Sequence, residues 1–340
     1  MLKKLLRKIL KPILTNTGPQ LYLKKKNKGK KLILNNIALE SFGNKNKEKI
    51  FYVIRRSPGA GLFSNYIYVV NHLLIADRHN FIPVIDMENY PTIYNENNSI
   101  YGTKNAWLYY FEPVSKYSLN EVYKSRNVII STNTFYKTFV HRIFASKNLL
   151  RFSKKIIIKK YIKQKVHKFL TKKLLYKHKT LGIHYRGTSY KDSANHPFPP
   201  TYNQLVKKID ALLKTKKFDK IFFATEDKEM FDLIIKKYKD KIVFYNSFRS
   251  IKNDAFKKYS RSNHRFKLGE EILIEGLILS KCHTFLFVET NVSTFVRLLK
   301  NKNQNLIPFE NGFNSSNEYI AKWLWYVKKI LPNCLGGFKV

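Results

Sequence analysis

The chain has 340 residues, of which 44% are hydrophobic and 15% aromatic, so it is too apolar to be disordered and long enough for two domains. Lys and Arg number 64 against 23 Asp and Glu, and the formal charge of +41 favours an anionic partner, either nucleic acid or a membrane surface. An AT-rich coding sequence would give the same richness in Lys, Asn, Ile, Phe and Tyr, so charge alone assigns no activity. Two cysteines, Cys282 and Cys334, exclude a disulfide framework and a zinc site built from cysteines, and they fit a reducing compartment.

The N-terminus predicts a basic amphipathic helix over residues 1–18. Leucines and isoleucines between Leu2 and Ile13 recur at helical spacing and cover about half of the helix circumference, with lysines and Arg7 opposite. Such a helix lies in the surface of an anionic bilayer, or else packs on its own protein. We expect the first arrangement, with residues 1–14 on the membrane. No run of about 18–20 uncharged apolar residues occurs, so no membrane span is expected.

Folded structure is predicted to begin with a βαβ unit. Residues 49–56 read as a strand, 62–79 as a helix and 81–87 as a second strand, which implies a parallel sheet. The intervening SPGAG loosely resembles a glycine-rich phosphate loop, which makes Gly59 and Gly61 candidate phosphate or acceptor contacts. The alternative is that both glycines only let the strand meet the helix closely.

The rest of the chain repeats the α/β pattern. After an irregular, aromatic middle with a strand over 127–131, one basic helix is predicted over 152–173. Further strands are predicted at 180–186, 219–227, 240–246, 283–290 and 304–310, and helices at 202–216, 228–238, 269–282, 291–301 and 317–330. This alternation is typical of a doubly wound parallel sheet.

The fold class predicted is α/β, with two Rossmann-like domains facing across a cleft. The ranges expected are an N-terminal helix at 1–18, an N-terminal acceptor domain at 49–175, a C-terminal donor-binding domain at 176–312, and a helix and tail at 313–340. Ligands of open α/β sheets bind at the carboxyl ends of the strands. Three unusual clusters stand at such ends in the second half.

The first cluster is His184-Tyr185-Arg186, where an apolar strand runs into an arginine. A guanidinium there can grip a phosphate with two hydrogen bonds and never loses its charge. The alternative is a surface arginine that happens to end a strand.

The other two clusters also lie where a strand meets a helix. Glu226 and Asp227 could bond a ribose, a base edge or a metal, or could cap the following helix. Ser293 and Thr294, with nearby amides and Arg297 one turn on, could hold a phosphate, or could form a plain N-cap.

The order of these clusters resembles a known superfamily. HYRGTSYKD, FATED and EGLILSKCHTFLFVETNVSTFVR follow one another as do the motifs of α1,6-fucosyltransferases, protein O-fucosyltransferases and rhizobial chitin-oligosaccharide fucosyltransferases. The stretch GAGLFSNYIYVVNHLLIADRHNFIPVID is similar to their first strand-helix-strand unit, in which a G-x-G precedes a long helix. The resemblance covers roughly residues 49 to 310.

The resemblance implies a GT-B fold, GDP-fucose as the donor, inversion at the anomeric carbon and no obligatory metal or cofactor. It implies that Arg186 binds the β-phosphate and stabilises the leaving GDP as the catalytic residue. Glu226 and Asp227 would contact guanosine. The full set of donor-binding positions that it implies is His184, Arg186, Glu226, Asp227, Glu275, Ser293 and Thr294.

Three departures from the family pattern leave the donor sugar open. Gly187 stands where core fucosyltransferases have a second arginine, Ser189 replaces an aspartate, and Glu275 replaces an aspartate. A GT-B enzyme that uses another nucleotide sugar, or a protein that binds one without catalysis, would tolerate these changes.

We expect the acceptor to be a bacterial surface glycan such as lipopolysaccharide or capsule. The basic N-terminal helix would hold the enzyme on the cytoplasmic side of the inner membrane, at the leaflet where lipid-linked acceptors lie. Asp86, Glu88 and Asp192 are candidates for the general base. The alternative class is a basic nucleic-acid-binding protein, although no nucleic-acid-binding motif occurs and the cations are spread along the chain.

Overall fold

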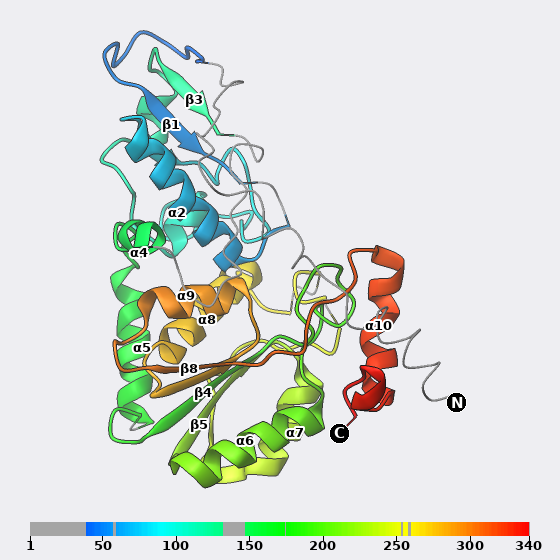
Figure 1. Ribbon diagram of the computed structural model, residues 1–340. Coiled ribbons are helices and arrows are strands. Elements are labelled where there is room, and N and C mark those ends of the chain that lie inside the picture. Colours follow the sequence, from blue (N-terminus) through cyan, green and yellow to red (C-terminus); the bar gives the residue numbers. More distant parts are fainter. Residues whose placement is uncertain are drawn as a thin grey trace.

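A computed structural model describes residues 39–56, 59–131, 147–173, 175–252, 254–257 and 260–339 (Figure 1). The helix predicted over 1–18 lies outside these residues. The described chain builds two parallel β-sheets with helices packed on them, which confirms the predicted α/β class. The predicted domain boundaries stay a prediction.

The smaller sheet has the order β2-β1-β3. It consists of β1 (Phe51–Ile54), β2 (Ile82–Ile85) and β3 (Val128–Ile130), and β1 pairs in parallel with both neighbours. All four residues of β1 are fully buried, as expected for a central strand covered on both faces. The helix α2 (Leu62–Arg78) connects β1 to β2, so the predicted βαβ unit is confirmed.

The larger sheet has the order β6-β5-β4-β7-β8, and every pair is parallel. Its strands are β4 (Thr180–Tyr185), β5 (Lys220–Thr225), β6 (Ile242–Val243), β7 (Thr284–Phe287) and β8 (Asn305–Pro308). The chain runs outward from β4 to β6 and then returns to the other side of β4. The strand order therefore reverses between β4 and β7, which is where a doubly wound sheet binds its ligand.

Helices cover both faces of the larger sheet. Figure 1 shows α6 (Tyr202–Lys216) and α7 (Lys228–Tyr238) on one face, and α5 (Lys160–Lys172), α8 (His264–Leu279) and α9 (Asn291–Leu299) on the other. Successive residues of a strand face opposite ways, so Leu181, Ile183 and Tyr185 pack with α6 and α7. His184 consequently faces the α8 side.

Two differences from the sequence prediction have local causes. The single helix expected over 152–173 is instead α4 (Lys147–Ser153) followed by α5, because the β-branched run Ile156 to Ile158 is drawn out into a bridge between Ile158 and Phe111. The helix expected to begin at Gly269 begins at His264 instead, since Phe266 is buried and adds a turn to the apolar face. The remaining short elements are η2 (Ala106–Tyr109), α3 (Leu119–Val122), η3 (Lys239–Lys241) and η4 (Asn333–Leu335).

The helix α2 joins the two halves of the molecule. Fourteen of its seventeen residues are buried, which is typical of a helix enclosed on all sides. Phe63 stacks on Phe295 of α9 with ring centroids 4.2 Å apart, and Tyr66 meets the same ring edge-on at 5.0 Å. The first half therefore packs directly on the helices that cover the second.

A second contact between the halves depends on Gly269 in α8. The Tyr110 ring lies against this residue, and its hydroxyl donates to the Phe266 carbonyl oxygen at 2.9 Å. A Cβ atom at position 269 would stand 2.2 Å from that hydroxyl oxygen and 2.5 Å from the adjoining ring carbon. Tyr110 is fully buried and has no room to move away.

We expect Gly269→Ala to destabilise the protein, because the overpacking outweighs the better helix propensity of alanine. The free energy of unfolding should fall by about 1–3 kcal/mol in urea denaturation. Lys208→Ala, on the exposed face of α6, introduces alanine into a helix without a clash and should leave stability within about 0.5 kcal/mol. Equal stabilities of the two variants would contradict the packing argument.

Candidate active site

Charged residues from three neighbouring strands meet at the carboxyl edge of the larger sheet. Arg186 follows β4, Glu226 follows β5, and Glu289 follows β7 by two residues. Tyr190 lies beside them, with its ring centroid 5.7 Å from the guanidinium carbon of Arg186. Burial raises the pKa of its hydroxyl to about 12, while Arg186 opposes that rise and the two glutamates reinforce it. The structure thus brings together Arg186 and Glu226 of the first two clusters with Glu289, which accepts a hydrogen bond from Ser293 of the third.

The Arg186 guanidinium is held in place but still reachable from solvent. Its side chain is 33% exposed, Nε lies 3.7 Å from Glu226 Oε1, and one terminal nitrogen donates to Ser189 Oγ at 3.2 Å. Burial lowers the pKa of Arg186, yet Glu226 and the tyrosines Tyr190 and Tyr94 together raise it above its ordinary value. A guanidinium has five N–H donors, so this one can take a further anion.

Glu226 holds the backbone beyond β4. Its Oε1 accepts hydrogen bonds from the Gly187 amide at 3.1 Å, the Thr188 amide at 3.2 Å and the Thr188 hydroxyl at 3.0 Å. The same oxygen is the one nearest Arg186. The carboxylate therefore fixes the turn that carries Arg186, while its ion pair with the guanidinium stays at 3.7 Å.

Asp227 serves the protein's own structure. It is the N-cap of α7, where its Oδ1 accepts from the Met230 amide at 3.0 Å, and Lys191 Nζ lies 3.1 Å from Oδ2. Only 2% of the residue is exposed. The capping role, weighed above as the alternative, is present in the structure.

Gly187 explains the missing second arginine of the family pattern. A Cβ atom there would stand 2.3 Å from Asp227 Oδ2 and 2.4 Å from a ring carbon of Tyr185. Both neighbours are buried, and Asp227 is bound on both oxygens. Any side chain at this position requires the Asp227 carboxylate and the Tyr185 ring to shift.

His184 is a neutral imidazole inside the site. It is 3% exposed, and burial, reinforced by the Arg186 charge, lowers its pKa to about 3. Its Nδ1 is buried and has no hydrogen-bond partner among the described residues. A buried unpartnered nitrogen next to Arg186 is a position from which a bound ligand can be contacted.

Glu275 of α8 belongs to a buried charge cluster beside the site. Its Oε1 accepts from Ser247 Oγ at 2.7 Å and lies 3.6 Å from Arg249, whose guanidinium stacks 3.7 Å from the Phe231 ring centroid. Arg249 also donates to the carbonyl oxygens of Ser247 and Tyr245. These contacts fasten the segment between β6 and α8 to the helix.

Ser293 and Thr294 lie at the buried start of α9. Thr290 and Ser293 form a capping box, and the Ser293 hydroxyl also donates to Glu289 at 3.0 Å. Arg297 pairs with Glu289 at 2.8 Å and donates to the Thr294 hydroxyl at 3.2 Å. The plain N-cap that was the alternative is therefore present, and both hydroxyls already have partners.

One tyrosine, Tyr94, links the residues after the glycine loop to the electrostatic environment of Arg186. The Leu62 amide, just after Gly61, donates to the Tyr94 hydroxyl at 2.9 Å. Burial raises the pKa of Tyr94 to about 12, and the charge of Arg186 acts against that rise. Tyr94 thus contacts the start of α2 and feels the charge of Arg186, while Gly59 and Gly61 themselves are exposed.

The three candidate bases differ in availability. Asp86 is fully buried and accepts from the amides of Glu88 and Asn89, the Asn89 side chain and the Tyr123 hydroxyl, so its carboxylate is already used within the protein. Glu88 is exposed and lines a cavity of about 370 Å³ at the end of β2. Asp192 accepts a hydrogen bond from Tyr326 of the last helix at 3.2 Å.

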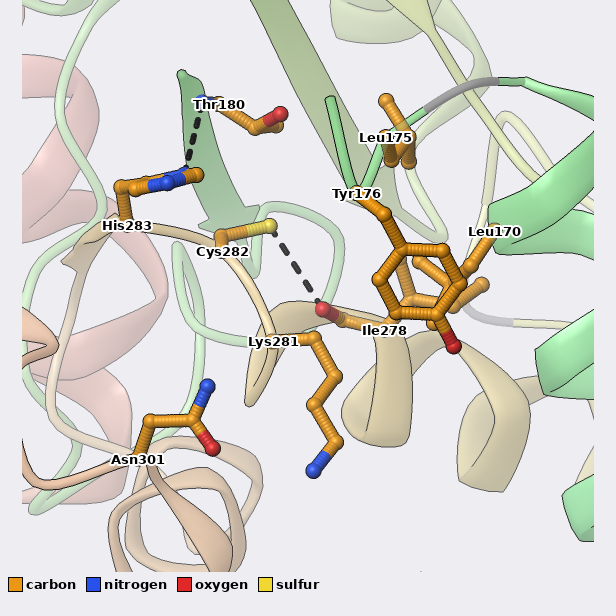
Figure 2. A pocket seen from close by; sticks show the side chains of 9 residues that line it. All are labelled: Leu170, Leu175, Tyr176, Thr180, Ile278, Lys281, Cys282, His283 and Asn301. Carbon is orange, nitrogen blue, oxygen red and sulfur yellow. Dashed lines mark hydrogen bonds between the residues drawn. The ribbon is translucent and has the colours of Figure 1, made fainter. Parts of the chain in front are cut away.

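A second cavity, of about 180 Å³, lies at the amino ends of β4 and β7, away from Arg186 (Figure 2). Two of its polar groups are bound within the protein: His283 Nδ1 accepts from the Thr180 amide, and the Cys282 thiol donates to the Ile278 carbonyl oxygen. In the part of the chain that the structure describes, no cluster of His, Cys, Asp and Glu is placed to hold a metal ion. None of the described helices is long and apolar enough to cross a membrane.

Sequence reasoning missed Tyr94, Tyr190 and Arg249. Tyr190 had a usable signal, because it lies four residues after Arg186 in the same motif. Tyr94 and Arg249 come from irregular segments, where no periodicity indicates which side chain turns inward.

We expect Gly187→Ala to destabilise the protein by about 1–3 kcal/mol, because the new methyl displaces Asp227 from its cap on α7. Urea denaturation measures this. Gly61→Ala is the matched control, since its Cβ would meet no atom nearer than 4.0 Å, and it should cost less. A larger loss at position 61 would sink the steric explanation.

The pH dependence of stability tests the burial of Glu275. Burial raises the pKa of Glu275 from 4.5 to about 7, with Arg249 and Ser247 opposing. Because the folded state then holds a proton that the unfolded state has released, this group's contribution falls as pH rises from 4.5 to 7. Relative to Glu275→Gln, the wild-type protein should lose roughly 2–3 kcal/mol of stability across this window. Parallel curves of unfolding free energy against pH for the two proteins would contradict the raised pKa of Glu275.

Comparisons with known proteins support the fold. No known family model matches the chain, and no curated protein matches it. NodZ α-1,6-fucosyltransferase co-crystallised with GDP is similar, with a TM-score of 0.53 and 15% identity over 78% of this chain and 96% of that chain. The fucosyltransferase NodZ from Bradyrhizobium is also similar, with a TM-score of 0.51 and 16% identity over 78% of this chain and 97% of that chain. The chain therefore has the mixed α/β, GT-B fold of these solved structures, as its motifs predicted.

Proposed function

We propose that the chain is a glycosyltransferase that transfers fucose from GDP-fucose to a glycan with inversion at the anomeric carbon. The observation that carries the proposal is Arg186, a charged, partly exposed guanidinium at the point where the strand order of the larger sheet reverses. The similar NodZ structure was crystallised with GDP, which favours the same nucleotide here.

The chemistry of glycosyl transfer suits this guanidinium. As the bond to the sugar breaks, positive charge develops on the anomeric carbon and negative charge on the departing diphosphate. A fixed cation at that diphosphate stabilises the transition state, and one group of this kind contributes about 3–4 kcal/mol. Glu226 keeps Arg186 in position through the turn at Gly187 and Thr188. In this proposal Arg186 does the work that a metal ion does in other sugar-nucleotide enzymes.

The other predicted residues shape the donor site around Arg186. His184 offers its buried, unpartnered Nδ1, and Ser293 with Thr294 lies at the start of α9 at the next strand end. Glu226 and Asp227 already accept internal hydrogen bonds, so we propose that they mainly hold the walls of the site. Glu275 acts likewise on the segment after β6.

The acceptor is proposed to be a bacterial surface glycan carried on a lipid. Glu88 is then the candidate base, because it is exposed beside a cavity in the first half, where the resemblance places the acceptor. Residues 1–14 would hold the enzyme at the inner leaflet of the membrane, next to such acceptors.

Thermal unfolding with added nucleotides tests the donor. A ligand that binds only the folded state at about 100 times its Kd stabilises by about 2.7 kcal/mol, so GDP and GDP-fucose should raise the Tm by several degrees and UDP and CDP should not. Arg186→Ala should abolish both this shift and GDP release in the presence of an acceptor. Arg126→Ala, an exposed arginine elsewhere, should change neither.

The outcomes separate the candidate functions. A rise in Tm with a different nucleotide would support a GT-B transferase but contradict GDP-fucose as its donor. No shift with any nucleotide, together with tight and steeply salt-dependent binding to oligonucleotides, would replace the proposal with nucleic-acid binding.

A further inference from the structure

The last helix, α10 (Glu318–Ile330), has two apolar faces. Ala321, Leu324 and Trp325 are buried against the body of the protein. The opposite face is open to solvent and carries six large apolar or aromatic side chains: Tyr319, Ile320, Trp323, Tyr326, Val327 and Ile330. In Figure 1 this helix (red) stands at the side of the molecule and covers neither sheet.

The six residues form one continuous stripe, called the α10 stripe below. At about 100° per residue they fall within an arc of about 120°. Exposure reaches 80% at Tyr319, 70% at Trp323 and 72% at Ile330. Six of the sixteen exposed large hydrophobic residues in the described chain therefore lie on one helix of thirteen residues. Such a concentration marks an interaction surface, whereas scattered exposed residues do not.

Charge decides which partner fits the α10 stripe. Lys322 and Lys329 are exposed along one edge of it, and Glu318 is the exposed acid at its start. The whole chain carries +41, so a second copy is repelled, and so is the chain's own basic segment at 1–14. The complementary partner is anionic.

The residue types point to a lipid surface among anionic partners. Tyrosine and tryptophan concentrate where a bilayer meets water, because each ring has an apolar body and a polar tip. Ile320, Val327 and Ile330 add aliphatic area that enters acyl chains but has no ring to stack on a nucleic-acid base. Lysines at the edge of such a stripe reach the anionic headgroups with their long stems.

We propose that the α10 stripe lies in the surface of an anionic membrane. This is a second contact, separate from the one proposed for residues 1–14, and it does not depend on the enzyme's donor.

Hydrogen bonds from α10 and from the residues just before it connect this surface to the candidate active site. Trp325 Nε1 donates to the Pro199 carbonyl oxygen at 2.9 Å, Tyr326 bonds Asp192 at 3.2 Å, and Asn314 donates to the Lys191 carbonyl oxygen at 3.3 Å. These partners belong to the segment that follows Arg186. A membrane under α10 therefore lies next to the loop beside the guanidinium, which suits an acceptor attached to a lipid.

Tryptophan fluorescence reports this contact in the full-length chain. The protein has three tryptophans, of which Trp107 and Trp325 are buried and Trp323 is exposed on the α10 stripe. Residues 1–38 contain none, so their binding produces no signal. Vesicles of phosphatidylcholine and phosphatidylglycerol in equal amounts, with brominated acyl chains, should quench the emission. Brominated phosphatidylcholine alone should quench little, because the lysines then lack anionic partners.

Paired variants separate the α10 stripe from general apolar exposure. Trp323→Ser with Ile330→Ser should lower vesicle partitioning roughly tenfold in sedimentation, because two large side chains no longer leave water. Tyr101→Ser with Ile251→Ser, which are similarly exposed elsewhere, should leave it unchanged. The Tm of each variant, and its response to GDP, checks the fold and the donor site independently.

Three results would overturn the proposal. The first is a vesicle-bound protein whose tryptophan emission is the same with brominated and ordinary lipid. The second is equal partitioning of the two paired variants. The third is a dimer in lipid-free sedimentation velocity that Trp323→Ser with Ile330→Ser dissociates, which would assign the α10 stripe to a second copy.

Discussion

The arrangement of the site depends on which groups the Glu226 carboxylate binds. Glu226 is the acid nearest Arg186, yet its closer oxygen accepts three hydrogen bonds from Gly187 and Thr188 and stays 3.7 Å from the guanidinium. A tighter ion pair would neutralise Arg186 and close it to ligands. Because Glu226 binds the backbone instead, the cation keeps its donors at the edge of the sheet, which is what a diphosphate requires.

The same turn accounts for the departure from the family pattern. At Gly187 the chain passes so close to Asp227 that no side chain fits, and Asp227 in turn caps α7. One cation therefore stands where two are expected. For the proposed transferase this concentrates the charge stabilisation on Arg186, with the neutral His184 beside it contributing a hydrogen-bonding atom and no charge.

Sequence predicted the fold well because both halves are built from short local signals. The sequence signals were strands rich in β-branched residues, helices with regular apolar spacing, and the alternation of the two. They predicted the bounds of β4, β5, α6 and α7 to within a residue or two. The break before α5 was missed because a tertiary bridge at Ile158 overrides helix propensity. In the site, residue types at strand ends identified Arg186, but not whether Asp227 or Ser293 would be used by the protein itself. That depends on side-chain partners far along the chain.

The buried helix α2 has a consequence for how substrates enter. Its rings pack on α9, and Tyr110 packs on Gly269 of α8, so swinging the halves apart would expose a large aromatic surface to water. Hinge opening is thus costly in this architecture. Conformational changes on donor binding are therefore expected in the irregular segments at the carboxyl edge of the sheet, especially in the segment after Arg186. This segment is hydrogen-bonded to α10 and to Asn314. A partner bound to the outer face of α10 therefore also restricts the motion of the segment at the entrance to the site.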